Sequence, residues 1–236
     1  IIDHADVRRM LAQMKAETFS ARAIALACAV AIDMARATGD AAWAARAALL
    51  TPIAKAYGTD TGNEVAYLGV QVHGGMGFIE ETGAAQFSRD VRVTAIYEGT
   101  NGIQAMDLVG RKMMDGGEAA FRLIDEVQAA AEAARAEVPD LSKDLWTAAE
   151  ALREATEALV AMSGHDRNAG AVPYLRAFAR VLGAHYHLAA ALADPARMPL
   201  ARFAIRRLLP EHAALLAQVR EGAEGLYALT PEALGV

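Results

Sequence analysis

The chain has 236 residues and a formal net charge of −6, with acidic and basic residues interspersed along it. Nucleic acid is a poor partner for such a chain, because binding of a phosphate backbone needs a concentrated basic face. The single cysteine, Cys28, excludes an intrachain disulfide and, without a signal-peptide pattern, favours a reducing cytoplasm. No run reaches the roughly 18 apolar residues that cross a bilayer, so no membrane contact is expected.

The composition favours an all-α fold. Hydrophobic residues make up 54% of the chain and are mainly alanine and leucine. These two residues suit helices, whereas β-branched residues suit sheets. The sequence starts at Ile1 without a methionine and is already within a helical pattern, which favours a piece of a longer protein. We expect an antiparallel helical bundle followed by a second, smaller helical unit.

In the first half of the chain, apolar spacing predicts helices separated by glycine and proline signals. The expected helices cover about residues 3–38, 41–50, 52–73, 81–90 and 102–114. Thr51 and Pro52 are expected to cap and start the third of these helices. Residues 91–97 alternate in polarity and are expected to form an extended connector rather than a paired strand.

The pair Gly116-Gly117 is the clearest boundary in the chain. It divides the sequence into an expected helical bundle domain of residues 1–115 and a second helical domain of residues 118–236. The helices expected beyond the boundary cover about residues 118–137, 141–162, 172–192, 199–208 and 211–229, with a loop at 164–170.

Glu98 is the strongest candidate for chemistry, and it lies in the segment YEGT at residues 97–100. A carboxylate just before a helix usually complements the positive end of the helix dipole, and spacing alone favours that interpretation. The alternative is a general base. Enclosure by Tyr97, Ile96 and Ile103 would desolvate the carboxylate and strengthen it as a base at neutral pH.

A glycine cluster, Gly74, Gly75 and Gly77, closes the helix that is expected to end near His73. Glycine allows positive φ and close approach of the backbone to another group. Phosphate-binding loops of the Rossmann or P-loop type follow a strand, whereas this cluster follows a helix. A helix cap and a ligand-binding turn therefore both remain open, and His73 is expected to be a capping or loop residue.

No pattern of histidine, cysteine or carboxylate residues predicts a metal site. His185 and His187 are two positions apart, so a helix directs them to different faces. Cys28 lies among alanines on an apolar face and is expected to be a buried small hydrophobe.

The order of these motifs resembles the C-terminal helical domain of the acyl-CoA dehydrogenases. The motifs are VQVHGGMGFIEET at residues 70–82, SRDVR at 88–92 and IYEGTNGIQ at 96–104, within a resemblance that covers about residues 3–113. The remaining residues, about 118–236, resemble by pattern and position the extra helical segment of a bacterial subgroup. That subgroup includes the 3-methylmercaptopropionyl-CoA dehydrogenases.

The resemblance implies roles for individual residues. Glu98 matches the base that removes the α-proton of the acyl thioester. Its backbone N–H matches the group that polarises the thioester carbonyl together with a ribityl hydroxyl of FAD. Gly99 matches a position next to the flavin and the substrate, where a side chain would crowd either of them.

Other positions match contacts to FAD. Gln71, Gly74 and Gly75 match contacts to its pyrophosphate and adenosine end, which in this family usually cross a subunit interface, and Thr100 matches a further contact. The resemblance therefore implies a homodimer or homotetramer. Gly102 stands where many members carry a flavin-contacting glutamine, so that role is not transferred.

The implied activity is the α,β-dehydrogenation of an acyl-CoA substrate, with FAD as cofactor and an electron-transferring flavoprotein as electron acceptor. The family's N-terminal helical domain and its middle β-domain have no counterpart in these residues, so we expect an incomplete active site. The alternative is a non-catalytic helical module whose role is oligomerisation.

Overall fold

The computed structural model describes residues 1–236 and contains helices and turns but no strand, which confirms the predicted all-α fold. The α-helices are α1 (Ala5–Thr38), α2 (Ala41–His73), α3 (Gly75–Phe78), α4 (Ala84–Arg92), α5 (Asn101–Val109), α6 (Glu118–Ala133), α7 (Pro139–Ala161), α8 (Gly164–Ala169), α9 (Ala171–Ala193), α10 (Met198–Phe203), α11 (Glu211–Arg220) and α12 (Glu224–Tyr227). Short 3₁₀ turns cover Glu80–Thr82, Val93–Ala95, Arg111–Met113, Ala134–Ala136 and Pro195–Arg197, and Ala204–Leu208 is π-helical.

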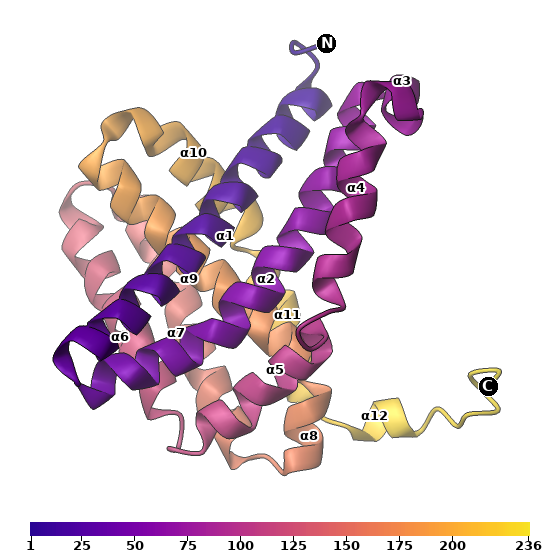
Figure 1. The fold of residues 1–236 in the computed structure, drawn as a ribbon. Helices are drawn as coiled ribbons and strands as arrows, with labels where there is room; N and C mark the ends of the chain where they lie inside the picture. Colours follow the sequence, from indigo (N-terminus) through magenta and orange to yellow (C-terminus); the bar gives the residue numbers. More distant parts are fainter.

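Two long antiparallel helices, α1 and α2, form the frame of the first segment (Figure 1). The predicted end of α1 is confirmed: Gly39 has φ +70°, and its N–H donates to the Ala35 carbonyl at 3.0 Å. Asp40 then caps α2, because its side chain accepts a hydrogen bond from the Ala42 N–H at 2.8 Å. This short connection lets the two helices pack along most of their length.

The predicted break in α2 is wrong, because the helix runs without interruption through Pro52. A proline within a helix removes one backbone hydrogen bond and usually kinks or ends the helix. Here the side chains of Leu49, Leu50 and Ile53, on both sides of the proline, are 0–1% exposed. Their burial in the core maintains the helix despite the local signal.

The expected extended connector at residues 91–97 is also wrong. Val91 and Arg92 complete α4, and a 3₁₀ turn follows at Val93–Ala95. The Thr94 hydroxyl donates to the Val91 carbonyl at 2.6 Å, which stabilises a turn in place of extended backbone. The expected loop at 164–170 contains the short helix α8.

One hydrophobic cluster runs through the residues on both sides of Gly116-Gly117. Ile24, Ile53 and Leu108 from the first segment and Tyr174 and Phe178 from α9 are all fully buried in it. Helix α9 therefore packs in the centre of the molecule, in contact with α1, α2 and α5 of the first segment and with α7 and α11 of the second. The second segment is joined to the first by a common core.

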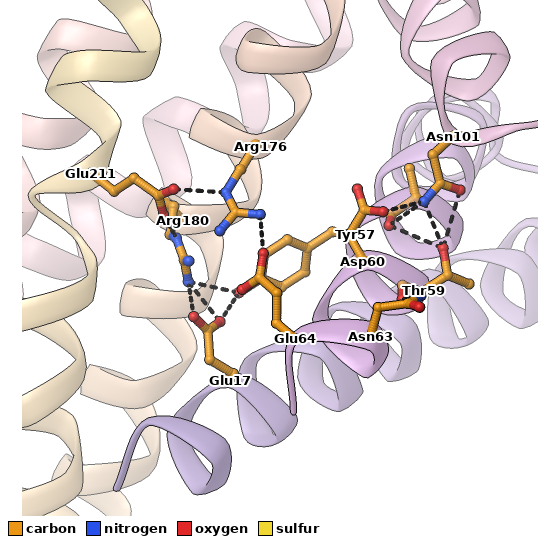
Figure 2. A network of polar contacts seen from close by, with 11 residues as sticks. Glu17, Tyr57, Thr59, Asp60, Asn63, Glu64, Asn101, Arg176, Arg180 and Glu211 are labelled. Atoms are coloured by element: carbon orange, nitrogen blue, oxygen red, sulfur yellow. Dashed lines mark hydrogen bonds and ion pairs between the residues drawn. The ribbon is translucent and has the colours of Figure 1, made fainter. Parts of the chain in front are cut away.

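A buried ion pair links α1 to α9 (Figure 2). Arg180 Nη1 donates to both carboxylate oxygens of Glu17 at 2.6 Å, and the Tyr57 hydroxyl donates to Glu17 Oε2 at 2.7 Å. Burial raises the pKa of Tyr57 well above its ordinary value, so the hydroxyl keeps the proton that it donates. Every oxygen of the buried carboxylate thus has a donor.

The same network extends to α11 and α2. Arg180 and Arg176 both donate to the carboxylate of Glu211, the latter from Nε at 2.8 Å, and Arg176 also pairs with Glu64. Burial alone would raise the pKa of Glu211, but the two guanidiniums outweigh it and hold that pKa below its ordinary value. The network fixes α9 and α11 against α1 and α2.

Helix α1 corrects one expectation from the sequence, since its length and composition would be sufficient to cross a membrane. Only 22% of its most apolar window is buried in this fold. Core helices of water-soluble proteins and signal sequences can have the same length and apolar composition, so these two properties alone do not identify a membrane-spanning helix. In the structure α1 packs along α2 and α9 and carries Glu17 of the buried ion pair.

Candidate active site

Glu98 adopts an unusual backbone conformation for a residue with a side chain. Its φ is +57°, and it is the one non-glycine residue in the chain with positive φ. Gly99 follows with φ +81°. Because the left-handed region costs a residue with a Cβ about 1–2 kcal/mol, surrounding contacts must hold Glu98 in place.

Two side chains hold the carbonyl groups on either side of the Gly99 Cα. Gln104 Nε2 donates to the Glu98 carbonyl at 3.1 Å, and Lys55 Nζ donates to the Gly99 carbonyl at 2.7 Å. A Cβ on Gly99 would lie 3.2 Å from Gln104 Nε2. Positive φ and this close approach both require glycine at position 99, in addition to the crowding of flavin or substrate that the family resemblance implies.

Asn101 connects the start of α5 to α2 (Figure 2). Its Oδ1 accepts a hydrogen bond from Lys55 Nζ at 2.8 Å, and its Nδ2 donates to Asp60 Oδ1 at 2.6 Å and to the Thr59 hydroxyl at 2.9 Å. The amide can take only this orientation, because the lysine ammonium only donates and the aspartate carboxylate only accepts. The contact anchors the YEGT segment to the middle of α2.

Thr100 caps helix α5. Its hydroxyl oxygen accepts a hydrogen bond from the Ile103 N–H at 3.3 Å. A hydroxyl that accepts at its oxygen still has its own hydrogen to donate. The exposed Thr100 therefore keeps one donor available to a ligand on the same surface as Glu98.

The expected enclosure of Glu98 is wrong within these residues. The Glu98 side chain is exposed, and the three apolar neighbours Ile96, Tyr97 and Ile103 are 52%, 54% and 52% exposed. They form an open apolar surface around the carboxylate.

The three glycines at the end of α2 differ in what the fold requires of them. Gly74 has φ +62°, and its N–H donates to the Gln71 carbonyl at 3.1 Å, which caps the helix. A Cβ on Gly77 would lie 2.3 Å from the Val70 carbonyl oxygen, so packing requires glycine there. Gly75 has neither constraint, because nothing lies within 4 Å of a Cβ at that position.

The structure groups only some of the predicted site residues. Glu98, Gly99 and Thr100 lie together beside Lys55, whereas Gln71, Gly74 and Gly75 lie at the far end of α2. The 16 residues from Lys55 to Gln71 span about 24 Å at the rise of an α-helix. Helix α3 begins at Gly75, and helix α5 follows Glu98 in the chain. Figure 1 shows that these two helices lie well apart along α2.

An apolar groove of about 420 Å³ lies beside the glycine turn, between α1, α2 and α4. It is lined by Met14, Gly62, Val65, Ala66, Gly69, His73, Thr82, Ala84, Phe87 and Val91. His73 Nδ1 lies 2.8 Å from the Gly69 carbonyl oxygen of its own helix, as expected of a capping residue. Cys28 is buried, as predicted. No three histidine, cysteine, aspartate or glutamate side chains lie close enough together to hold a metal ion.

Models of known protein families match both segments of the chain. The C-terminal domain of acyl-CoA dehydrogenases matches residues 1–114, and a domain described as acetyl-CoA dehydrogenase C-terminal like matches residues 123–230. The chain belongs to the acyl-CoA dehydrogenase family. The resemblance of the motifs around the glycines and Glu98 is thereby confirmed at the level of the family.

One relative of this chain is the 3-methylmercaptopropionyl-CoA dehydrogenase of Ruegeria pomeroyi, 45% identical over 185 residues. The match covers 74% of the chain and 32% of that relative. Two solved structures share the fold of this chain. Caenorhabditis elegans ACDH-11 in complex with C11-CoA has a TM-score of 0.72 and 19% identity, over 83% of this chain and 35% of the other.

The second structure is a Bacillus anthracis acyl-CoA dehydrogenase complexed with FAD, with a TM-score of 0.62 and 18% identity. The match covers 93% of this chain and 43% of the other. The chain thus spans less than half the length of each of these three proteins.

Proposed function

We propose that these residues supply the catalytic base and one edge of the cofactor site of an FAD-dependent acyl-CoA dehydrogenase. The observation that carries this proposal is the conformation of Glu98 in IYEGTNGIQ, a strained left-handed residue held by Gln104 and Lys55 contacts. Strained residues of this kind cluster at functional sites. The reaction is α,β-dehydrogenation of an acyl-CoA, with an electron-transferring flavoprotein as acceptor, in the cytoplasm.

In this reaction the Glu98 carboxylate takes the α-proton of the thioester. The Glu98 N–H donates to the thioester carbonyl oxygen and stabilises the negative charge that develops there as the α-proton leaves. The chemistry that bound FAD would supply is acceptance of the β-hydrogen as a hydride. The open apolar surface of Ile96, Tyr97 and Ile103 contacts the acyl chain or the apolar cover that excludes water from the carboxylate.

The residues at the end of α2 fit the polar end of an extended cofactor. Gly74 and Gly75 have open space where a side chain would stand, and the Gln71 side chain beside them is exposed. Glycines without side chains allow the backbone to approach a pyrophosphate closely. With the Thr100 hydroxyl, these residues would hold FAD along one edge.

A second copy of the chain supports this arrangement, as a homodimer or homotetramer. Gln71 lies about 24 Å along α2 from Lys55, which contacts Gly99 next to Glu98, so we expect a partner subunit to bring one set of cofactor residues toward the other. Large apolar side chains are also exposed on the surface of the chain, among them Phe78 (81%), Phe87 (74%) and Met114 (83%). Exposed patches of this kind mark interfaces.

The proposal is tested by Glu98→Gln in the full-length, FAD-loaded enzyme. Loss of a general base lowers turnover by about 10²- to 10⁴-fold, so acyl-CoA-dependent reduction of a dye acceptor should fall by that factor while FAD absorbance is unchanged. Glu81→Gln, at an exposed carboxylate, is the matched control and should keep its turnover. Near-normal activity of Glu98→Gln would overturn the assignment.

The second candidate is a non-catalytic oligomerisation module. The exposed apolar residues Leu26 and Val30 on α1, 64% and 55% exposed, favour it together with those on α4. Sedimentation of the purified 236-residue chain without flavin tests this alternative. Dimers or tetramers support assembly through these helices, whereas a monomer contradicts it.

A further inference from the structure

Lys55 is a half-buried lysine on α2 whose ammonium has no carboxylate among its hydrogen-bond partners. Its ammonium instead donates to the Gly99 carbonyl at 2.7 Å and to Asn101 Oδ1 at 2.8 Å. Partial burial of a charge without a counter-charge opposes folding. The placement of this ammonium is therefore better explained by what it does to the YEGT segment than by stability alone.

Anchoring of α5 does not require Lys55. The two hydrogens of Asn101 Nδ2 are already shared among Asp60 Oδ1 at 2.6 Å, the Thr59 hydroxyl at 2.9 Å and the Ala56 carbonyl at 3.2 Å. These contacts fasten the first residue of α5 to α2. The contribution that only Lys55 makes is the charge-assisted hydrogen bond to the Gly99 carbonyl.

That carbonyl belongs to the peptide group immediately after the left-handed pair. Holding the Gly99 carbonyl from α2, and the Glu98 carbonyl from Gln104, restricts the backbone angles of both residues. The φ of +57° at Glu98 is then maintained before any substrate binds. A fixed backbone sets the direction of the Glu98 N–H and of the Cα–Cβ bond that carries the carboxylate.

We propose that Lys55 is a positioning residue for Glu98: its ammonium keeps the Glu98–Gly99 turn in the left-handed conformation that catalysis needs. The inference rests on the proposed role of Glu98 as the base. It assigns a reaction-specific role to a residue 43 positions earlier in the chain. The hydrogen bond involves a full charge, which makes it about twice as strong as a neutral one.

The kinetic test compares Lys55→Met with Lys143→Met in the full-length, FAD-loaded enzyme. Lys143 is an exposed lysine on α7, so the control removes the same charge far from the site. We expect kcat of Lys55→Met to fall by about 10- to 100-fold with KM for acyl-CoA within about twofold, because preorganisation is lost and ground-state binding is kept. Lys55→Arg, which keeps the charge, should recover part of kcat.

Two kinetic outcomes would overturn the inference. A kcat within about twofold of the Lys143→Met control would show that the turn does not depend on Lys55. A raised KM with unchanged kcat would make Lys55 a substrate contact.

A structural test on the 236-residue chain needs no activity. In isotope-labelled Lys55→Met, the backbone NMR shifts of Glu98 and Gly99 should move away from left-handed values. The amides of Ile103 and Gln104, which bind the Thr100 cap, should exchange at an unchanged rate, because Asn101 still anchors α5. Unchanged shifts at Glu98 would overturn the positioning role. An active Glu98→Gln enzyme would instead overturn the proposed base, so the two failures are distinguishable.

Discussion

Arg180 Nη1 lies 2.6 Å from both carboxylate oxygens of Glu17, although the two residues are 163 positions apart. Their side chains are 5% and 1% exposed. Glu17 lies in the segment that matches the acyl-CoA dehydrogenase C-terminal domain, and Arg180 in the second matched segment. This ion pair therefore fixes the second domain on the helices that carry the candidate active site.

Breaking the pair is expected to destabilise the chain strongly. Arg180→Met leaves the Glu17 carboxylate buried, with the Tyr57 hydroxyl as its remaining donor. Removal of one partner of a buried ion pair costs about 3–5 kcal/mol, because the other charge stays buried without compensation. Urea denaturation of the 236-residue chain measures the change in unfolding free energy.

The control is Arg135→Met, which removes an arginine from the exposed pair with Glu132, where the side chains are 66% and 58% exposed. Exposed pairs contribute little, so this variant should unfold close to the parent. The double variant Glu17→Gln with Arg180→Met should recover part of the loss, because no uncompensated charge remains. A single Arg180→Met variant as stable as the control would contradict the argument.

Two histidines on α9, the buried His187 and the half-buried His185, predict a loss of stability in mild acid. Burial lowers the pKa of His187, and the hydrogen bond of its ring with the Ala16 carbonyl opposes this only partly. Burial also lowers the pKa of His185. The folded pKa values thus lie below the unfolded value of about 6.5, so the unfolded chain binds more protons as pH falls through that value.

The stabilisation from neutral His185 and His187 is fully present above pH of about 6.5 and is lost as pH falls toward their folded pKa values. Urea unfolding at pH 7.5, 6 and 5 should show a falling free energy, and His187→Gln should reduce the slope. His4→Gln, at an exposed residue, should leave the slope unchanged. An equal free energy of unfolding of the parent chain at all three pH values would contradict the lowered pKa of His185 and His187.

Features of the fold that depend on residues close together in the sequence were predictable from it. The end of α1 at Gly39 arises from local backbone chemistry, so the sequence pattern was sufficient to predict it. The helix through Pro52 was not predictable in this way. The burial of Leu49 and Ile53 against other helices overrides the local signal, and no pattern within α2 reports that burial.

The candidate site shows the same division. The YEGT motif predicted Glu98 and its neighbours as the site, and the structure adds that Glu98 is held in a left-handed conformation. Lys55 was missed, because its contact with the Gly99 carbonyl joins residues 44 positions apart and leaves no local pattern. Only the fold brings this lysine to the turn.

The glycine turn offers a paired test of cofactor binding. Gly75→Ala places a Cβ in open space without positive φ, so the unfolding free energy of the chain should be unchanged. If FAD approaches this backbone, the same variant of the full-length enzyme should lose FAD on dilution, measured by flavin fluorescence in the filtrate. Gly77→Ala is the matched comparison, because its Cβ would lie 2.3 Å from the Val70 carbonyl oxygen and should cost about 1–3 kcal/mol of stability. Full FAD retention by Gly75→Ala would remove Gly75 from the cofactor site, since the fold itself places no demand for glycine there.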